Sequence, residues 1–141
     1  MGLTNGFTSL KGVRVKKVGA GSDLKDVDLG ELVSSSSSGS KTLVVLGTYA
    51  ADFNAIEYGQ RLKHYLPELH AKGVEDVCLV LNAKPESCRA FASYLELPES
   101  VKLLSDPTGE AGRAFGVSRG WLPDDESVSP YAKLFGMLVG R

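Results

Sequence analysis

The stretch TLVVL (residues 42–46) decides the fold, because a strand covered on both faces of a sheet needs such a continuous apolar run. A second run, VCLVL (77–81), and a shorter one, VKLL (101–104), follow it, and helical patterns of apolar residues separate the three. This alternation predicts an α/β three-layer sandwich in which helices flank a mainly parallel central sheet. We expect residues 42–46 to form a central strand.

Two helices are predicted between these strands. The first runs from Phe53, which we expect to supply an apolar contact, to about Gly73, and Pro67 should kink or split it. The second begins at Pro85, because the first turn of a helix tolerates proline, and it continues through Leu95.

Shorter signals predict the flanking segments. Residues 13–18 alternate apolar and basic side chains, as a half-buried strand does. Six serines and a glycine at residues 34–40 predict a flexible loop. Asp106 and Pro107 suit the N-cap and first position of a further helix. Residues 134–139 are a candidate fourth strand of the core.

Composition limits the classes of function. A chain of 141 residues with 43% hydrophobic residues suits one domain spanning 1–141. Sixteen basic and seventeen acidic residues leave a net charge of -1, so we expect no nucleic-acid partner. No apolar run approaches the roughly 20 residues of a membrane span, so we expect no membrane insertion. Two cysteines, Cys78 and Cys88, favour a reducing compartment and show no metal-ligand spacing, and we expect neither metal nor cofactor.

Two motifs resemble parts of one protein family. AADFNAIE (50–57), which follows an apolar strand and opens a helix, resembles the active-site loop of the AhpC/TSA peroxiredoxins. LLSDPTGEAGRAFGV (103–117) resembles a later segment of the same family. GTYAADFN (47–54) and FGVSRGW (115–121) are similar to the peroxiredoxin-like proteins of cyanobacteria and chloroplasts. The resemblance spans about residues 41–135 and implies a thioredoxin fold, with an antioxidant or redox setting in the chloroplast or cytoplasm.

The resemblance also shows what this loop lacks. In register with Asp52, the family's proline, threonine or serine, and reactive cysteine fall on Ala50, Asn54 and Glu57, and its later arginine falls on Ala132. Peroxide reduction needs a thiolate nucleophile and donors that stabilise the developing charge, and a carboxylate cannot form a sulfenic acid. We therefore predict a binding or structural module without peroxidase activity.

A second hypothesis places redox chemistry at Cys88. This residue lies about one turn into the helix that Pro85 opens, where the helix dipole and Arg89 should lower the thiol pKa while Glu86 opposes them. The chain would then be a thiol-disulfide oxidoreductase or an antioxidant redox sensor. The alternative is a small side chain packed on a helix face, and we expect Cys78, within an apolar strand, to be structural.

The acidic residues of the loop leave two interpretations open. Asp52 and Glu57 form an acidic pair near the carboxyl ends of the strands, where α/β sheets bind ligands. Alternatively, Asp52 is a helix N-cap and Glu57 forms an i,i+4 ion pair with Arg61.

Two features suggest a protein partner or self-association. Trp121, within a turn, and Tyr131 are aromatic residues of the kind found at interfaces. The family's fold normally continues beyond the position where this sequence stops at Arg141, so we expect a shortened carboxyl end and one open sheet edge.

Overall fold

The structure, a computed structural model, describes residues 6–19, 22–35, 39–117, 127–129 and 132. Apart from two consecutive strands near the start, strands and helices alternate along these residues. In chain order the elements are α1 (Gly6–Leu10), β1 (Arg14–Val18), β2 (Leu24–Asp28), α2 (Leu29–Ser34), β3 (Lys41–Leu46), α3 (Phe53–Ala71), β4 (Val74–Leu81), α4 (Pro85–Leu95), β5 (Val101–Ser105) and α5 (Glu110–Ala114).

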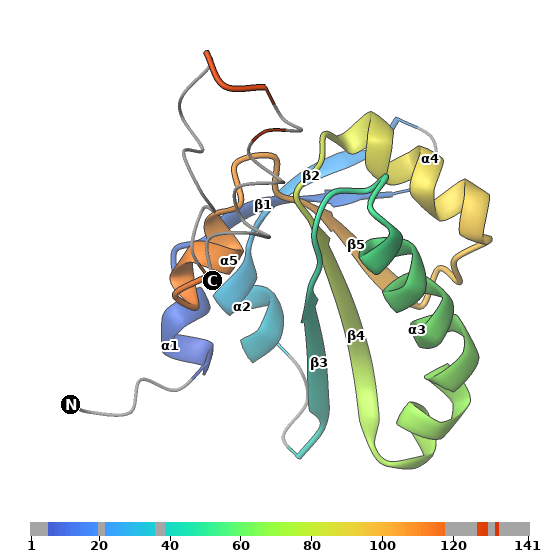
Figure 1. Cartoon of the computed structure of the whole chain (residues 1–141). Helices are drawn as coiled ribbons and strands as arrows, with labels where there is room; N and C mark the ends of the chain where they lie inside the picture. The colour runs from blue at the N-terminus through green and yellow to red at the C-terminus, as the bar shows by residue number, and fades with distance from the viewer. Residues whose placement is uncertain (1–5, 20–21, 36–38, 118–126, 130–131, 133–141) are drawn as a thin grey trace.

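The strands form one sheet with the order β2-β1-β5-β4-β3 (Figure 1). β3, β4 and β5 are parallel, as expected for strands joined by helical crossovers. β1 is antiparallel both to β2 and to β5, with Lys16 opposite Ser105. The sheet is therefore mixed, because an amino-terminal hairpin extends the parallel part.

Helices cover both faces of the sheet, which confirms the three-layer α/β prediction. α3 and α4 lie on one face, and α1, α2 and α5 on the other (Figure 1). Successive side chains of a strand point to opposite faces. Val77, Leu79 and Leu81 of β4 accordingly belong to the core under α3 and α4, while Cys78 and Val80 belong to the other core.

The apolar run of β3 does not form a central strand. Among the described residues β3 is the outermost strand beside β4, and its side chains are half-buried apart from the exposed Lys41. The fully buried strand is β4, whose residues 77–81 are all buried. Both strands have continuous apolar sequences, so the sequence pattern did not distinguish the edge of the sheet from its centre.

The first predicted helix is confirmed as α3, but two details differ. Pro67 lies within the helix and does not split it. Phe53 is 87% exposed rather than part of the core. The core contacts of α3 are made by Ala55, Leu62 and Leu66. Gly59 is buried as well, and an added Cβ there would lie 2.9 Å from Cζ of Phe91 and 2.5 Å from Cδ1 of Leu95. α3 thus approaches α4 closely.

The serine-rich segment is partly ordered. Ser34 is the last residue of α2 and Ser35 is its C-cap, and their hydroxyls donate to the carbonyl oxygens of Glu31 and Leu32. The predicted flexible loop therefore begins inside a helix, and its residues 36–38 lie outside the described residues.

The helix predicted to start at Asp106 starts later. α5 begins at Glu110, and its N-cap is Gly109 with φ of 70°. Asp106 is buried and still caps the helix, because its carboxylate accepts hydrogen bonds from the backbone N–H groups of Glu110 (3.1 Å) and Ala111 (2.8 Å). The predicted strand 134–139 lies outside the described residues. Within the described parts of the chain, no helix is both long and apolar enough to cross a membrane.

Candidate functional site

The loop between β3 and α3 starts where two backbone segments of the chain approach each other closely. The N–H of Gly47 donates to the carbonyl oxygen of Val80 at 2.8 Å, and an added Cβ at Gly47 would lie only 3.0 Å from that oxygen. The N–H of Asn82 donates to Thr48 O at 3.0 Å, so the pairing of β3 with β4 continues into the loop. The Thr48 hydroxyl is buried and has no hydrogen-bond partner within the described ranges of the chain. The loop is therefore fixed at the carboxyl end of the parallel strands.

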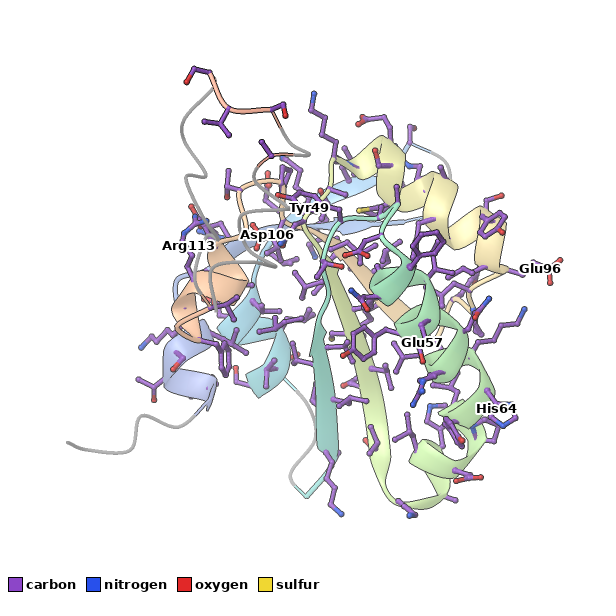
Figure 2. The ribbon with its side chains drawn as sticks, viewed as in Figure 1. Tyr49, Glu57, His64, Glu96, Asp106 and Arg113 are labelled. Carbon is purple, nitrogen blue, oxygen red and sulfur yellow. The ribbon has the colours of Figure 1, made fainter. Side chains whose placement is uncertain are left out.

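The acidic residues of this loop have structural contacts. Asp52 is the N-cap of α3, and its Oδ1 accepts from the N–H of Asn54 at 3.2 Å. One turn later, Oε1 of Glu57 lies 2.7 Å from Nη2 and 3.0 Å from Nε of Arg61. Figure 2 shows Glu57 on α3, well along from the loop that carries Tyr49. The interpretation as a cap and an i,i+4 pair is confirmed, and the two carboxylates do not face each other across a site.

A hollow rimmed by aromatic residues lies beside this loop, and we call it the aromatic hollow. It has a volume of about 600 Å³ at the carboxyl ends of β3 and β4, where it opens between the loop and α4. Its lining is mainly apolar: Tyr49, Ala50, Ala51, Ile56, Asn82, Ala83, Ser87, Ala90, Phe91 and Tyr94. Tyr49 is 69% and Tyr94 76% exposed, which is unusual for such large side chains. Of the four residues predicted for the degenerate loop, Ala50 lines this hollow.

Cys88 is buried beneath α4 rather than presented to solvent. Its Sγ lies 3.8 Å from Ala83 O, a weak hydrogen bond. Burial raises the thiol pKa to about 11, with a smaller contribution in the same direction from Glu86, while Ser105 and Arg89 oppose the rise. Arg89 lowers this pKa and Glu86 raises it, as expected, but the expected net lowering is wrong, because desolvation outweighs the effect of Arg89.

Cys78 lies in the other core. It is buried within β4, and burial raises its pKa as well. Because Cys78 and Cys88 pack on opposite faces of the sheet, both remain free thiols.

The remaining predicted residues are placed as follows. Trp121 and Tyr131 lie outside the described residues. Ala132, at the place of the family's arginine, is exposed, and its N–H donates to Ser129 Oγ at 3.2 Å. The described segments contain no group of three or more acidic, histidine or cysteine side chains that would hold a metal ion.

The sequence and the structure were compared with those of known proteins. No family model matches the sequence, and no curated protein matches it. Solved structures do match, among them oxidised Prx3 of Vibrio vulnificus, with a TM-score of 0.61 and 18% identity, and the reduced form of that protein in complex with hydrogen peroxide, with a TM-score of 0.58 and 17% identity. The chain has a thioredoxin-like peroxiredoxin fold. In both matches the alignment covers 76% of this chain and 65% of the other, and at this identity the likeness shows the fold alone.

The aromatic hollow was missed by the sequence analysis. Tyr94 lies on α4, nearly forty residues beyond the loop, and only the side-by-side packing of α3 and α4 brings it to Tyr49. A signal was present, because Tyr49 directly precedes the quoted loop (50–57) and Phe53 lies within it. Helical periodicity alone assigned Phe53 to the core.

Proposed function

We propose that this chain is a peroxiredoxin-like binding module without peroxidase activity. The single observation that carries the proposal is Glu57, which stands where the resemblance places the reactive cysteine and whose carboxylate is occupied by Arg61. The chemistry supports the same conclusion, because a carboxylate has no route to the sulfenic acid that thiol peroxidases form.

The burial of both thiols supports the proposal further. A thiol with a pKa of about 11 has a negligible thiolate fraction at neutral pH, and Cys88 also lacks an exposed surface from which to attack. The alternative of a redox enzyme or sensor acting through Cys88 is therefore disfavoured by the same geometry. It requires local opening of α4 before any reaction.

The aromatic hollow is the surface that we infer to bind. Tyrosine and phenylalanine are enriched at interfaces because they bury a large apolar area at little entropic cost. Tyr49 and Tyr94 present such area beside one hollow, and the exposed Phe53 follows as the first residue of α3. The chain's net charge of -1 places little electrostatic repulsion between two copies. We infer that a second copy or a partner protein covers this hollow, and that the outer edge of β3 is a second place of association.

From the resemblance we infer that this module works in the chloroplast or cytoplasm. The resemblance implies antioxidant relatives, and we propose that the chain lacks their activity.

The test of the proposed function is hydrogen peroxide consumption with dithiothreitol as reductant. The wild-type chain, Cys88→Ser and Cys78→Ser are assayed together, Cys78→Ser being the matched control in the opposite core. We expect all three to remain at the background of the buffer. Turnover by the wild type that Cys88→Ser abolishes and Cys78→Ser retains would establish a thiol enzyme and refute the proposal.

The binding surface is tested by sedimentation of the wild type and of Tyr94→Lys, with Tyr65→Lys as the control. Tyr65 also lies exposed, on α3, but it does not line the aromatic hollow. If copies associate through the hollow, Tyr94→Lys shifts the chain to the monomer and Tyr65→Lys does not. Equal behaviour of all three proteins would show that copies do not associate through the hollow.

A further inference from the structure

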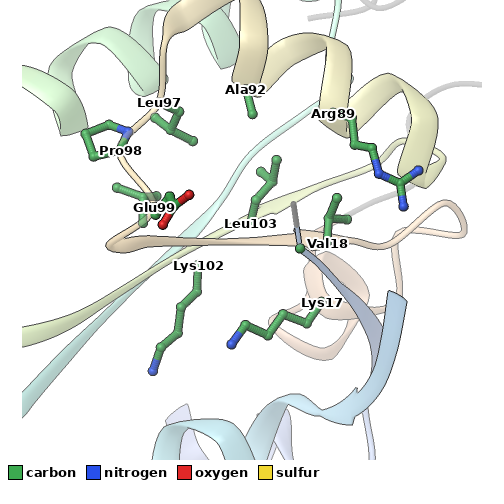
Figure 3. Close-up of a pocket in the computed structure, with 11 residues that line it drawn as sticks. Lys17, Val18, Arg89, Ala92, Leu97, Pro98, Glu99, Lys102 and Leu103 are labelled. Atoms are coloured by element: carbon green, nitrogen blue, oxygen red, sulfur yellow. The ribbon is translucent and has the colours of Figure 1, made fainter. Parts of the chain in front are cut away.

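A second hollow lies on the same side of the sheet as α4, and we call it the Arg89 hollow (Figure 3). Its volume is about 450 Å³, within the range of small-molecule sites. Most of its wall is apolar and comes from the end of β1, α4, the connection after α4, and β5: Val18, Ala92, Leu97, Pro98, Val101 and Leu103. It shares no lining residue with the aromatic hollow.

Arg89 gives this apolar hollow a cation. Its Nε and Nη2 atoms are buried and have no hydrogen-bond partner among the residues that the structure describes. Glu99 lines the same hollow, but no ion pair between Glu99 and Arg89 is present in this described part of the chain. Arg89 as a whole is only partly buried, but buried N–H groups that lack an acceptor are costly, and native proteins rarely leave them so.

The geometry of the unpartnered atoms indicates the chemistry of the missing acceptor. Nε and the neighbouring Nη together form one edge of the planar guanidinium, which holds the two oxygens of a carboxylate in parallel hydrogen bonds. Both orphaned atoms of Arg89 belong to this edge. A two-oxygen anion satisfies both at once.

The nearby lysines contribute charge rather than contact. Figure 3 shows the side chains of Lys17 and Lys102 extending from the strands on the side away from α4 and Arg89. Nζ of Lys102 lies 2.5 Å from Asp76 Oδ1 and is neutralised by it. Lys17 adds positive potential at the hollow. Glu99, which also lines the hollow, offsets one of the two positive charges of Arg89 and Lys17. A ligand there meets one net positive charge, which favours a single negative charge over a phosphate dianion.

We propose that the Arg89 hollow binds a small monocarboxylate with an apolar tail. The carboxylate pairs with the Nε–Nη2 edge of Arg89, and the tail packs against Ala92, Leu97 and Leu103. Because this edge is covered in the unliganded chain, the Arg89 side chain turns toward the ligand on binding.

The experiment titrates the intact chain with octanoate and follows the Nε–H resonance of Arg89 by two-dimensional ¹H–¹⁵N NMR. We expect saturable shifts of this resonance and of the backbone amides of Ala92 and Leu97. Octan-1-ol, which has the same tail and no charge, should bind at least about tenfold more weakly, since hydrogen bonds to charged groups are among the strongest. This comparison needs no variant.

Variants then assign the charge. Arg89→Gln should weaken octanoate binding at least about tenfold and leave octan-1-ol unchanged, whereas Arg61→Gln, on exposed α3, should alter neither. Arg89→Lys keeps a cation but lacks the two-donor edge, so its affinity for octanoate should lie between those of the wild type and Arg89→Gln. The proposal is overturned if octanoate does not saturate the Arg89 resonance, if octan-1-ol binds equally well, or if folded Arg89→Gln binds octanoate like the wild type.

Discussion

The Cys88 thiol and the Ser105 hydroxyl share one acceptor, the carbonyl oxygen of Ala83, at 3.8 Å and 2.7 Å. This shared contact lies in the core between α4 and the sheet. Because the hydroxyl makes the shorter bond, Ser105 satisfies the carbonyl and the thiol behaves as a small apolar side chain.

The raised pKa of Cys88 predicts a loss of stability in alkali. The thiol keeps its proton to about pH 11 in the folded chain but loses it near 9 when unfolded, so it has no effect below about pH 9. Between these values the free energy of unfolding should fall by up to about 2–3 kcal/mol. Urea denaturation at pH 8 to 11 measures the fall, which should be smaller in Cys88→Ala.

Cys78→Ala is the comparison variant for this experiment, since it retains the contribution of Cys88 and removes that of Cys78, whose pKa burial also raises. If Cys88→Ala loses stability with pH as steeply as the wild type does, the thiol is not the group responsible.

A cysteine restored at position 57 should not restore catalysis. In Glu57→Cys the new thiol takes an exposed position on α3, so it should react readily with iodoacetamide. Its rate with hydrogen peroxide should stay within about tenfold of free cysteine, because Asn54 and Ala132 do not replace the donors that stabilise the developing charge.

The rate is followed by loss of peroxide under single-turnover conditions, with the double variant Glu57→Cys/Cys88→Ser to assign the reacting thiol. A rate more than about a hundredfold above that of free cysteine would mean that the loop still stabilises the transition state.

Two glycines in helices should respond to alanine in opposite directions. Gly59→Ala should destabilise the fold by about 1–3 kcal/mol, because the added Cβ would lie 2.9 Å from the Phe91 ring. Gly112→Ala in α5 meets nothing closer than 3.7 Å and should stabilise by up to about 1 kcal/mol through helix propensity. Thermal and urea unfolding measure both, and stabilisation by Gly59→Ala would show that α3 moves away from α4 at no cost.

Removal of the buried cap at Asp106 should be severe. Asp106→Ala leaves the N–H groups of Glu110 and Ala111 without acceptors and should cost about 2–3 kcal/mol. Asp52→Ala, which removes the more exposed cap of α3, should cost about 1 kcal/mol. Equal losses of stability in the two variants would contradict the special role of burial.

The sequence predicted individual helices and strands better than it predicted their positions in the sheet. Periodicity and capping signals located α3, α4 and β4, and the N-cap at Asp52 and the ion pair of Glu57 with Arg61 depend only on local spacing. Whether β3 lies at the centre or the edge depends on strand order, which its own residues do not encode. β2 was not predicted, since its alternation of charges resembles a loop.

The candidate sites were the least predictable part. The pKa of Cys88 depends on how closely α4 packs on the sheet, and the dipole argument contained no term for that burial. The unpartnered guanidinium of Arg89 is equally invisible in sequence, because a lack of partners is a property of the assembled fold.

The antiparallel pairing of β1 with β5 also determines when the fold can be completed. Lys16 lies opposite Ser105, so this contact joins residues 89 positions apart. During synthesis the amino-terminal hairpin emerges first but has to wait until β5 leaves the ribosome before it gains its partner on that side. Such long-range closure slows folding. β1, the first strand to be synthesised, is therefore among the last to complete its pairing in the sheet.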